Sequence, residues 1–404
     1  LTYHFRILDS PVVNAFAVPG GYLYFTRGIL AQFTNEAELI GVLGHEMGHV
    51  TARHTVSQQS KQQLGQLLLL GGMVASEDFR DFAPYAMQGM QLLFLKYSRD
   101  AERESDRLGV EYASKLQYDA QQMANFFNVL DRMHDTEGPQ GIPTFLSTHP
   151  DPGDRYENVT ELSQKWKEKL PNDEWLVKED SYLQMIEGMV YGEDPRQGFE
   201  EDDVFYHPEM KFKFPVPSGW MLVNSPSQVQ MAPEGGEALI VFTLSDQKSA
   251  ETAAESALSA LELKTVESQR TTVNGMPAVA TVSERVTQDQ QTGQEQNIRV
   301  LSYFIEYGGS IYVFHGVTSN NRFANYLRNF EATFDNFDRL TDTSKLNRQP
   351  DRIRLRQVKQ SGSVSSILAG LGVPKDRLEE IALLNNMELN DQVQAGETIK
   401  VVGQ

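Results

Sequence analysis

The chain has 404 residues, no cysteine and a formal net charge of −19 at pH 7. This length allows roughly two to four domains, and the hydrophobic and charged fractions of 40% and 23% exclude a mainly disordered chain. The negative charge argues against a general nucleic-acid binder, and the missing cysteines exclude disulfides and thiolate metal ligands.

The first 25 residues predict a strand and a hairpin. Residues 3–8 alternate in a strand-like way, and residues 12–25 predict two strands joined at Pro19-Gly20-Gly21. An exposed strand edge in this hairpin could hold an extended peptide through backbone hydrogen bonds. A purely structural hairpin is the alternative.

Two helices should follow, over residues 28–33 and 35–54. Thr34 or Asn35 can cap the second helix, since both side chains accept hydrogen bonds from backbone N–H groups. His54 lies on the last turn, off the face of the other histidines, where we expect a capping role or a role behind metal ligands.

The second of these helices carries His45-Glu46-Met47-Gly48-His49. Histidines four apart share one helical face, so both imidazoles can reach one ion, with Glu46 beside them. A catalytic zinc site has three protein ligands and one open position, where a nearby carboxylate can take a proton from water. The pattern indicates a zinc protease, unless the histidines share the helix by chance. The glycines of the helix would let another backbone come close, namely Gly41, Gly44 and Gly48.

A second helix is predicted around residues 97–109, and it offers a third ligand. Glu102 and Asp106 are four apart and share a face. One could bind the metal while the other accepts a proton from the free nitrogen of a ligating imidazole. The alternative is that this charge-rich run is an ordinary solvated helix face.

The residues HEMGHV at 45–50 and YSRDAERESD at 97–106 resemble peptidase family 48 of the metallo clan. This family includes the HtpX, OMA-type and beta-barrel-assembly-enhancing proteases. The resemblance implies that Glu102 is the third zinc ligand, and Glu104 stays a near-miss candidate. The hairpin resembles the family too, because residues 14–17 read Asn-Ala-Phe-Ala. In the family, a strand with this sequence lies beside the active site.

Residues 57–95 predict further helical structure, which could line the cleft as a lid or form a helix-hairpin core. After a helix over residues 121–134, the prolines of the loop at residues 144–155 would hold His149 in place. The family resemblance extends to its Thr-His-Pro-x-Pro-x-x-Arg element, which lies at the active site in related soluble members. His149 could stabilise the oxyanion, or it could occupy the open position of zinc and keep the enzyme latent.

Residues 154–190 predict helices, and an acidic linker follows. The next residues predict an antiparallel sheet with two helices, which faintly resembles PsbP-like domains and carries no catalytic constellation. Its helices are expected over residues 250–263 and 321–334, and an Asn-Gly hairpin turn at Asn274. We expect this domain to bind or position other molecules.

The tail reads strand, helix, helix, strand over residues 353–402. Its Ile-Ala-Leu-Leu-Asn at 381–385 and Gly-Glu-Thr-Ile-Lys at 396–400 look like a LysM module, a small fold often used to bind peptidoglycan. A generic βααβ appendage is the alternative. The LysM resemblance implies a cell-envelope protein.

The predicted fold is α+β. A mainly helical gluzincin-type metalloprotease domain with a small sheet is expected over residues 1–192 and an acidic linker over 193–204. An antiparallel-sheet α+β domain should span residues 205–342, and the βααβ LysM-like module residues 350–404.

The expected function is zinc-dependent hydrolysis of protein or peptide substrates in the periplasm or cell envelope of a bacterium, in protein quality control. The expected Zn²⁺ ligands are His45, His49 and Glu102, and the expected catalytic residues are Glu46, His149 and Asp106. Peptidoglycan or envelope proteins are further expected partners, and nucleic acid is not. No run is long enough to cross a bilayer, although the sequence starts at Leu1 and a missing N-terminal segment could associate with a membrane. The alternatives are a zinc-containing chaperone or assembly factor, or a peptidoglycan-binding scaffold with little proteolysis.

Overall fold

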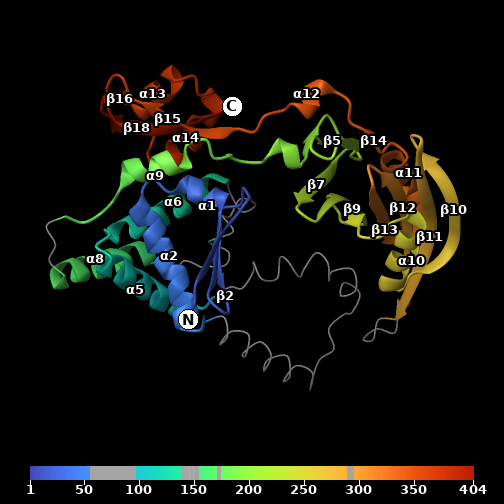
Figure 1. The fold of residues 1–404 in the computed structure, drawn as a ribbon, viewed down its shortest axis with the longest axis horizontal. Coiled ribbons are helices and arrows are strands. Elements are labelled where there is room, and N and C mark those ends of the chain that lie inside the picture. The colour runs from blue at the N-terminus through green and yellow to red at the C-terminus, as the bar shows by residue number, and fades with distance from the viewer. Residues whose placement is uncertain (55–96, 138–144, 146–148, 150–153, 171–173, 289–294) are drawn as a thin grey trace. The chain divides into compact units, whose positions relative to one another are not determined.

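The computed structural model describes residues 1–54, 97–137, 145, 149, 154–170, 174–288 and 295–404 (Figure 1). These residues form two compact units, which are described separately. Unit 1 comprises the described residues of 1–193 together with 350–404, and unit 2 those of 194–349. The helical expectation for residues 57–95 lies outside the described residues.

Unit 1 begins with a small sheet whose strand order is β1-β3-β2. The strands are β1 (His4–Leu8), β2 (Ala15–Val18) and β3 (Tyr22–Thr26). β2 and β3 form the predicted antiparallel hairpin, and its turn needs glycine because Gly20 and Gly21 have φ of 100° and 92°. β1 pairs with β3 in parallel. β2 therefore keeps one edge without a strand partner among the described residues.

The helices of unit 1 follow this sheet in the chain. They are α1 (Arg27–Gln32), α2 (Glu36–Thr51), α5 (Arg99–Lys115), α6 (Gln121–Glu137), α8 (Arg155–Lys169) and α9 (Glu179–Ile186). The Asn35 side chain accepts a hydrogen bond from the Glu38 N–H and caps α2, so Asn35 rather than Thr34 is the cap. Ser98 caps α5 in the same way.

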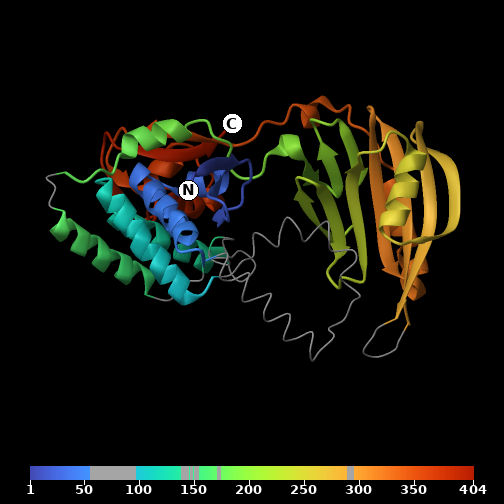
Figure 2. The same ribbon diagram turned by 60° about the horizontal axis from the view of Figure 1, so that its bottom comes forward.

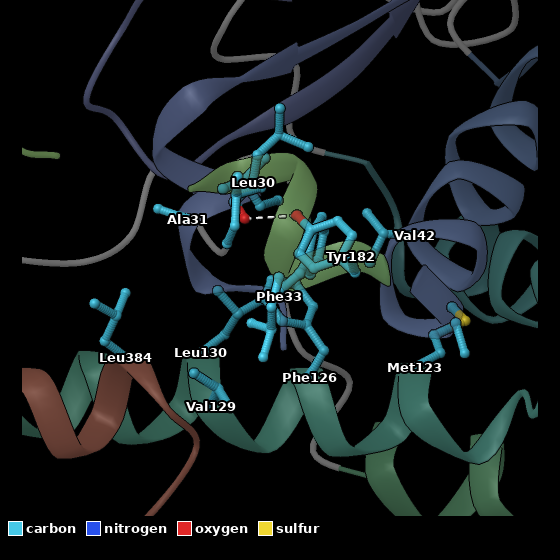
Figure 3. Close-up of a cluster of buried hydrophobic side chains, with 14 of the residues drawn as sticks. Leu30, Ala31, Phe33, Val42, Met123, Phe126, Val129, Leu130, Tyr182 and Leu384 are labelled. Atoms are coloured by element: carbon cyan, nitrogen blue, oxygen red, sulfur yellow. Dashed lines mark hydrogen bonds between the residues drawn. The ribbon is translucent and has the colours of Figure 1, made fainter. Parts of the chain in front are cut away.

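Residues 350–404 belong to unit 1 and share its hydrophobic core. Their elements are β15 (Arg352–Gln357), β16 (Gly362–Ser363), α13 (Val364–Gly370), η5 (Lys375–Arg377), α14 (Leu378–Leu384), β17 (Gln392–Val393) and β18 (Thr398–Gly403). β15 pairs with β18, which completes the predicted strand-helix-helix-strand order. Figure 3 shows Leu384 of α14 in the same cluster as Leu130 of α6 and Tyr182 of α9.

Unit 2 contains a seven-stranded and a four-stranded antiparallel sheet in its described part. The orders are β10-β11-β12-β13-β9-β8-β7 and β14-β6-β5-β4. The strands are β4 (Phe199–Glu201), β5 (Val204–His207), β6 (Phe212–Pro215), β7 (Trp220–Ser225), β8 (Gln228–Pro233), β9 (Ala238–Ser245), β10 (Lys264–Val273), β11 (Met276–Gln288), β12 (Glu295–Tyr307), β13 (Ser310–Ser319) and β14 (Asp338–Arg339). Asn274 and Gly275 form the predicted turn between β10 and β11, with φ of 46° and 79°. Residues 193–204, expected as an acidic linker, include η3 (Pro195–Gln197) and the strand β4.

Two helices cover opposite faces of the larger sheet, as Figure 2 shows for α10. The helices of unit 2 are α10 (Ala250–Ala260), α11 (Phe323–Phe334) and α12 (Thr343–Leu346), with η4 (Asn320–Arg322) before α11. Phe330 and Phe334 of α11 pack against one face, whereas alanines of α10 pack against Phe304 on the other. Helices and strands thus combine in both units, which confirms an α+β fold in general terms. Among the described helices, none has both the length and the apolar character needed to span a membrane.

Candidate metal centre

Glycines allow α2 and α5 to cross at close range, as the sequence predicted. A Cβ atom added to Gly44 would lie 3.0 Å from the Cα of Gly109. A Cβ atom added to Gly48 would lie 3.0 Å from the Cα of Ser105. Larger side chains at these positions would push the two backbones apart. The close crossing sets Glu102 of α5 against the two histidines of α2.

His45, His49, Glu102 and His149 form a group with the spacing of metal ligands. Each offers one ligand atom, and these atoms all lie within 4.8 Å of one another. The Nε2 of His45 is 3.0 Å from the Nε2 of His49 and 3.5 Å from Oε2 of Glu102. Ligand atoms about 2.1 Å from a tetrahedral zinc ion would lie roughly 3.4 Å apart. Two imidazoles and a carboxylate at these separations therefore fit zinc.

The group is enclosed, and several of its polar atoms have no hydrogen-bond partner. His45, Glu46, His49, Glu102 and His149 are all 0% exposed. Both carboxylate oxygens of Glu46 lack a hydrogen bond, as do Oε2 of Glu102 and Nε2 of His149. Leaving a buried polar group unpaired costs roughly 1–3 kcal/mol, and more for a charge. Oε1 of Glu46 lies 3.5 Å from Nε2 of His149, and Oε2 of Glu102 lies 3.4 Å from Nη2 of Arg155, so their contacts are ion pairs without hydrogen-bond geometry. A bound cation and a reacting water would use these atoms.

A buried ion pair lies against His45, and Nη2 of Arg155 in this pair is 3.3 Å from Nε2 of His45 and 3.4 Å from Oε2 of Glu102. Arg155 donates from Nε and Nη2 to the two oxygens of Asp106, at 2.9 and 2.8 Å. Oδ1 of Asp106 lies 2.8 Å from Nδ1 of His45, so it can accept the proton of that nitrogen and leave Nε2 facing the group. Burial acts to raise the pKa of Asp106, but Arg155 holds it below its ordinary value. The sequence assigned no role to Arg155, and its place in the Thr-His-Pro-x-Pro-x-x-Arg pattern was the available signal.

A second chain of contacts supports His49. Nδ1 of His54 lies 3.1 Å from Nδ1 of His49, and Nε2 of His54 lies 3.2 Å from Oε2 of Glu104. The Glu104 side chain is 49% exposed and stands outside the ligand group. Its position agrees with Glu102 as the ligand, and His54 lies where a role behind the ligands was expected.

Backbone hydrogen bonds tie His149 to Phe145 and, through it, to the segment just before β2. Its backbone N–H donates to the carbonyl of Phe145 at 2.8 Å, and the Phe145 N–H donates to the carbonyl of Val13 at 3.1 Å. The Phe145 ring also stacks on the His149 ring, with centroids 4.5 Å apart. Nδ1 of His149 is 3.3 Å from both Nε2 of His45 and Oε1 of Glu102.

The protonation of two ligand candidates suits a cation. Burial and the neighbouring His45 lower the pKa of His49 well below its ordinary value, so its imidazole is neutral. Burial acts to raise the pKa of Glu102, but His149 and His45 together hold this pKa well below its ordinary value. A neutral imidazole and an ionised carboxylate are the forms that bind metal.

Two other groups are shifted upward. Burial raises the pKa of Glu46 above its ordinary value. Burial and Arg155 act to lower the pKa of His45, but hydrogen bonds to Asp106 and Glu102 raise it to about 9. A cation bound at His45 would therefore release a proton, and Glu46 is suited to take a proton from a reacting group.

A cavity of about 460 Å³ adjoins His49. Val18 and Pro19 line it from the end of the β2 edge strand, and Val50 and Arg53 line it from the end of α2. Leu1, Tyr3 and Gly20 line it as well, so it lies at the end of the sheet that carries the hairpin turn.

Residues 1–163 match the sequence model of Peptidase family M48. The mitochondrial metalloendopeptidase OMA1 of Bos taurus is 30% identical over 168 residues, which cover 39% of this chain and 32% of the relative. The beta-barrel assembly-enhancing protease of Yersinia pestis is 29% identical over 174 residues, which cover 41% of this chain and 35% of the relative. The matched region thus spans about a third of the length of these relatives.

Among solved structures, that of cyanobacterial PsbP from Synechocystis covers 34% of this chain and 91% of its own. Its TM-score is 0.27 and its sequence identity 12%. The PsbP-like and LysM-like readings stay predictions. The family match, by contrast, covers α2 and α5, the helices that carry His45, His49 and Glu102. Residues 1–163 are therefore similar to a peptidase family M48 domain.

Proposed function

We propose that the protein is a zinc-dependent endopeptidase that hydrolyses peptide bonds of protein substrates. The observation that carries this proposal is the buried carboxylate of Glu46, which makes no hydrogen bond and lies beside the ligand group. The names of the relatives, a metalloendopeptidase and a protease, support it.

In this proposal His45 and His49 hold zinc through Nε2, and Glu102 holds it through its carboxylate. When bound, zinc supplies a Lewis acid that lowers the pKa of water and polarises a peptide carbonyl. Glu46 accepts the proton of the attacking water and passes it to the leaving amine. Asp106, itself held by Arg155, keeps the His45 ring turned so that Nε2 faces the centre.

His149 keeps this centre latent by taking the fourth ligand position. Its Nδ1 stands 3.3 Å from atoms of both His45 and Glu102, within the ligand group. Stabilisation of the oxyanion by His149, which the sequence left open, is the second possibility. Because all five side chains at the centre are 0% exposed, a substrate reaches it only after His149 and its surroundings move.

An extended substrate would add to the free edge of β2, through backbone hydrogen bonds. The cavity beside His49 would take one of its side chains, with Arg53 favouring an acidic group nearby. We place this activity in bacterial envelope protein quality control, on the strength of the relatives named beta-barrel assembly-enhancing proteases. Residues 350–404 would bind peptidoglycan, and residues 205–342 would bind or position clients.

A zinc-containing chaperone or assembly factor is the second candidate, and the closed centre favours it. Two variants separate the possibilities when cleavage of an unfolded protein such as casein is followed by gel. E46Q should lower kcat roughly 10²–10⁴-fold and leave zinc content unchanged. H149A should cleave faster than the wild-type protein if His149 holds the enzyme latent, and more slowly if it stabilises the oxyanion. Full peptidase activity in E46Q would refute the role of Glu46, and no cleavage by wild type or H149A would favour the chaperone.

A further inference from the structure

A lysine from the last strand is buried in the core of unit 1. Lys400 of β18 is 0% exposed. Its Nζ lies 2.9 Å from the carbonyl oxygens of Ala31 and Phe33 and 3.4 Å from that of Gln32. An ammonium group has three protons to donate, so three carbonyls can satisfy it.

The three carbonyls are those at the end of α1. The last carbonyls of a helix have no partner within it, and they carry the negative end of the helix dipole. Lys400 thus caps α1 from a position more than 360 residues further along the chain. The Asn385 side chain fixes the Lys400 backbone in turn, since it accepts from the N–H at 2.7 Å and donates to the carbonyl at 2.8 Å.

The capped end of α1 leads directly into α2. The Glu38 carboxylate, in the first turn of α2, accepts hydrogen bonds from the N–H and the hydroxyl of Thr34 at 2.6 and 2.9 Å. The short turn between the helices is therefore held by Lys400 on one side and by Glu38 on the other. His45 lies seven residues beyond Glu38 on the same helix, about 10 Å along its axis.

Lys400 and Glu38 also interact through their charges. Burial lowers the pKa of Lys400 to about 7, and the Glu38 charge opposes that shift. Burial raises the pKa of Glu38 to about 7, and hydrogen bonds from Thr34 and the Lys400 charge oppose it. A chain that only needed to fill this space could use a hydrophobic residue, as Ile399 and Val401 do on either side.

We propose that Lys400 is a positioning residue of the metal centre: by capping α1 it fixes the start of α2 and hence the two histidines. Residues 350–404 are then a working part of the peptidase unit rather than only an attachment device. This inference rests on the proposed function where it concerns catalysis. Its structural part, the fixing of α2, can be tested without any activity.

The test compares K400M with K359M in the full-length protein, because Lys359 lies on the same segment and is exposed. Hydrogen exchange of peptides covering residues 36–49 should be roughly tenfold faster in K400M at a temperature where both variants are folded. Zinc affinity, measured by competition with a chelator, should fall roughly tenfold or more, and kcat should fall with KM unchanged. K359M should match the wild-type protein in all three.

Wild-type exchange and zinc affinity in K400M would overturn the proposal, as would equal effects in K359M. If K400M does not fold, the K400M/E38Q variant leaves the Glu38 position without a buried charge, and it must show faster exchange and weaker zinc binding than E38Q alone. If neither the wild-type protein nor H149A cleaves casein while K400M still shows faster exchange in α2, the proposed function fails and the positioning role stands.

Discussion

Glu46 and Asp106 are both buried carboxylates, yet their surroundings suit them to different roles. Asp106 receives two hydrogen bonds from Arg155 and lies against Nδ1 of His45, so its position and charge are fixed. Glu46 has no hydrogen-bond partner on either oxygen, and burial raises its pKa. Environments that shift the pKa values of two carboxylates in opposite directions commonly make one an orienting group and the other a proton acceptor.

Replacing Arg155 tests whether Asp106 orients His45. R155M should destabilise the protein by roughly 3–5 kcal/mol, because it leaves the buried Asp106 charge without its partner. Zinc affinity should also fall, since Asp106 would no longer be held against His45. Urea denaturation and zinc competition measure the two effects. R103M is the control: the Arg103 side chain is 47% exposed and pairs on the surface, so its loss should cost less than about 1 kcal/mol. Equal losses in the two variants would contradict the orienting role.

The sequence predicted the residues of the ligand group and placed Asp106 and His54 behind them, but it did not predict their partners Arg155 and Glu104. His45, Glu46 and His49 follow from helical spacing, and Glu102 follows from a family resemblance. Arg155 and the His54–Glu104 pair reach their partners across the fold. No local pattern specifies such contacts, because they depend on how α2, α5 and α8 pack.

At the scale of elements, the crossing of α2 and α5 sets the geometry of the centre. Local signals sufficed for much of this region: the Asn35 cap, the glycines of α2 and the hairpin turn all appear as predicted. Other pairings escaped prediction. The parallel pairing of β1 with β3 and the short strand β4 rest on partners that local alternation does not identify.

A methyl group at the crossing should therefore disturb the centre. G44A places a Cβ 3.0 Å from the backbone of Gly109, which should cost roughly 1–3 kcal/mol of stability through overpacking. Zinc affinity should fall as well, because Glu102 would move away from the histidines. G370A is the matched control, since a Cβ there meets nothing within 4 Å and alanine favours a helix. Zinc binding by G44A as tight as that by G370A would show that the close crossing does not set the metal centre.

At the scale of the whole molecule, residues 350–404 and residues 1–193 share one core. The sequence suggested a separate module because the tail has its own complete pattern of strands and helices. Lys400 illustrates why packing was hidden: between Ile399 and Val401, a lysine in a strand reads as a solvent-facing residue. Its three carbonyl partners come from the far end of the chain.

Unit 2 should respond to acid through His315. This residue is buried, its Nδ1 lies 2.8 Å from the Ser302 hydroxyl, and burial lowers its pKa to about 4 from an ordinary 6.5. Between these values the unfolded chain binds a proton that the folded unit does not. Stability is therefore complete above about pH 6.5 and declines as the pH falls toward 4, by roughly 3 kcal/mol in all.

Urea denaturation followed by Trp220 fluorescence, with Trp166 and Trp175 replaced by Phe, measures this decline in unit 2. H315Q should be less stable at pH 7, because it loses the packing and hydrogen bond of the imidazole. It should also lose less stability between pH 6.5 and 4 than its parent. An identical pH dependence in both proteins would show that other groups cause the acid response.

The most direct test of the central claim is anomalous X-ray scattering at the zinc edge from crystals of the full-length protein, since it is independent of latency and of the substrate. We predict one anomalous peak in unit 1, which marks a zinc ion about 2.1 Å from Nε2 of His45, Nε2 of His49 and the Glu102 carboxylate. A zinc-loaded protein with no peak between these side chains, or with its zinc bound elsewhere, would contradict the proposed metallopeptidase centre.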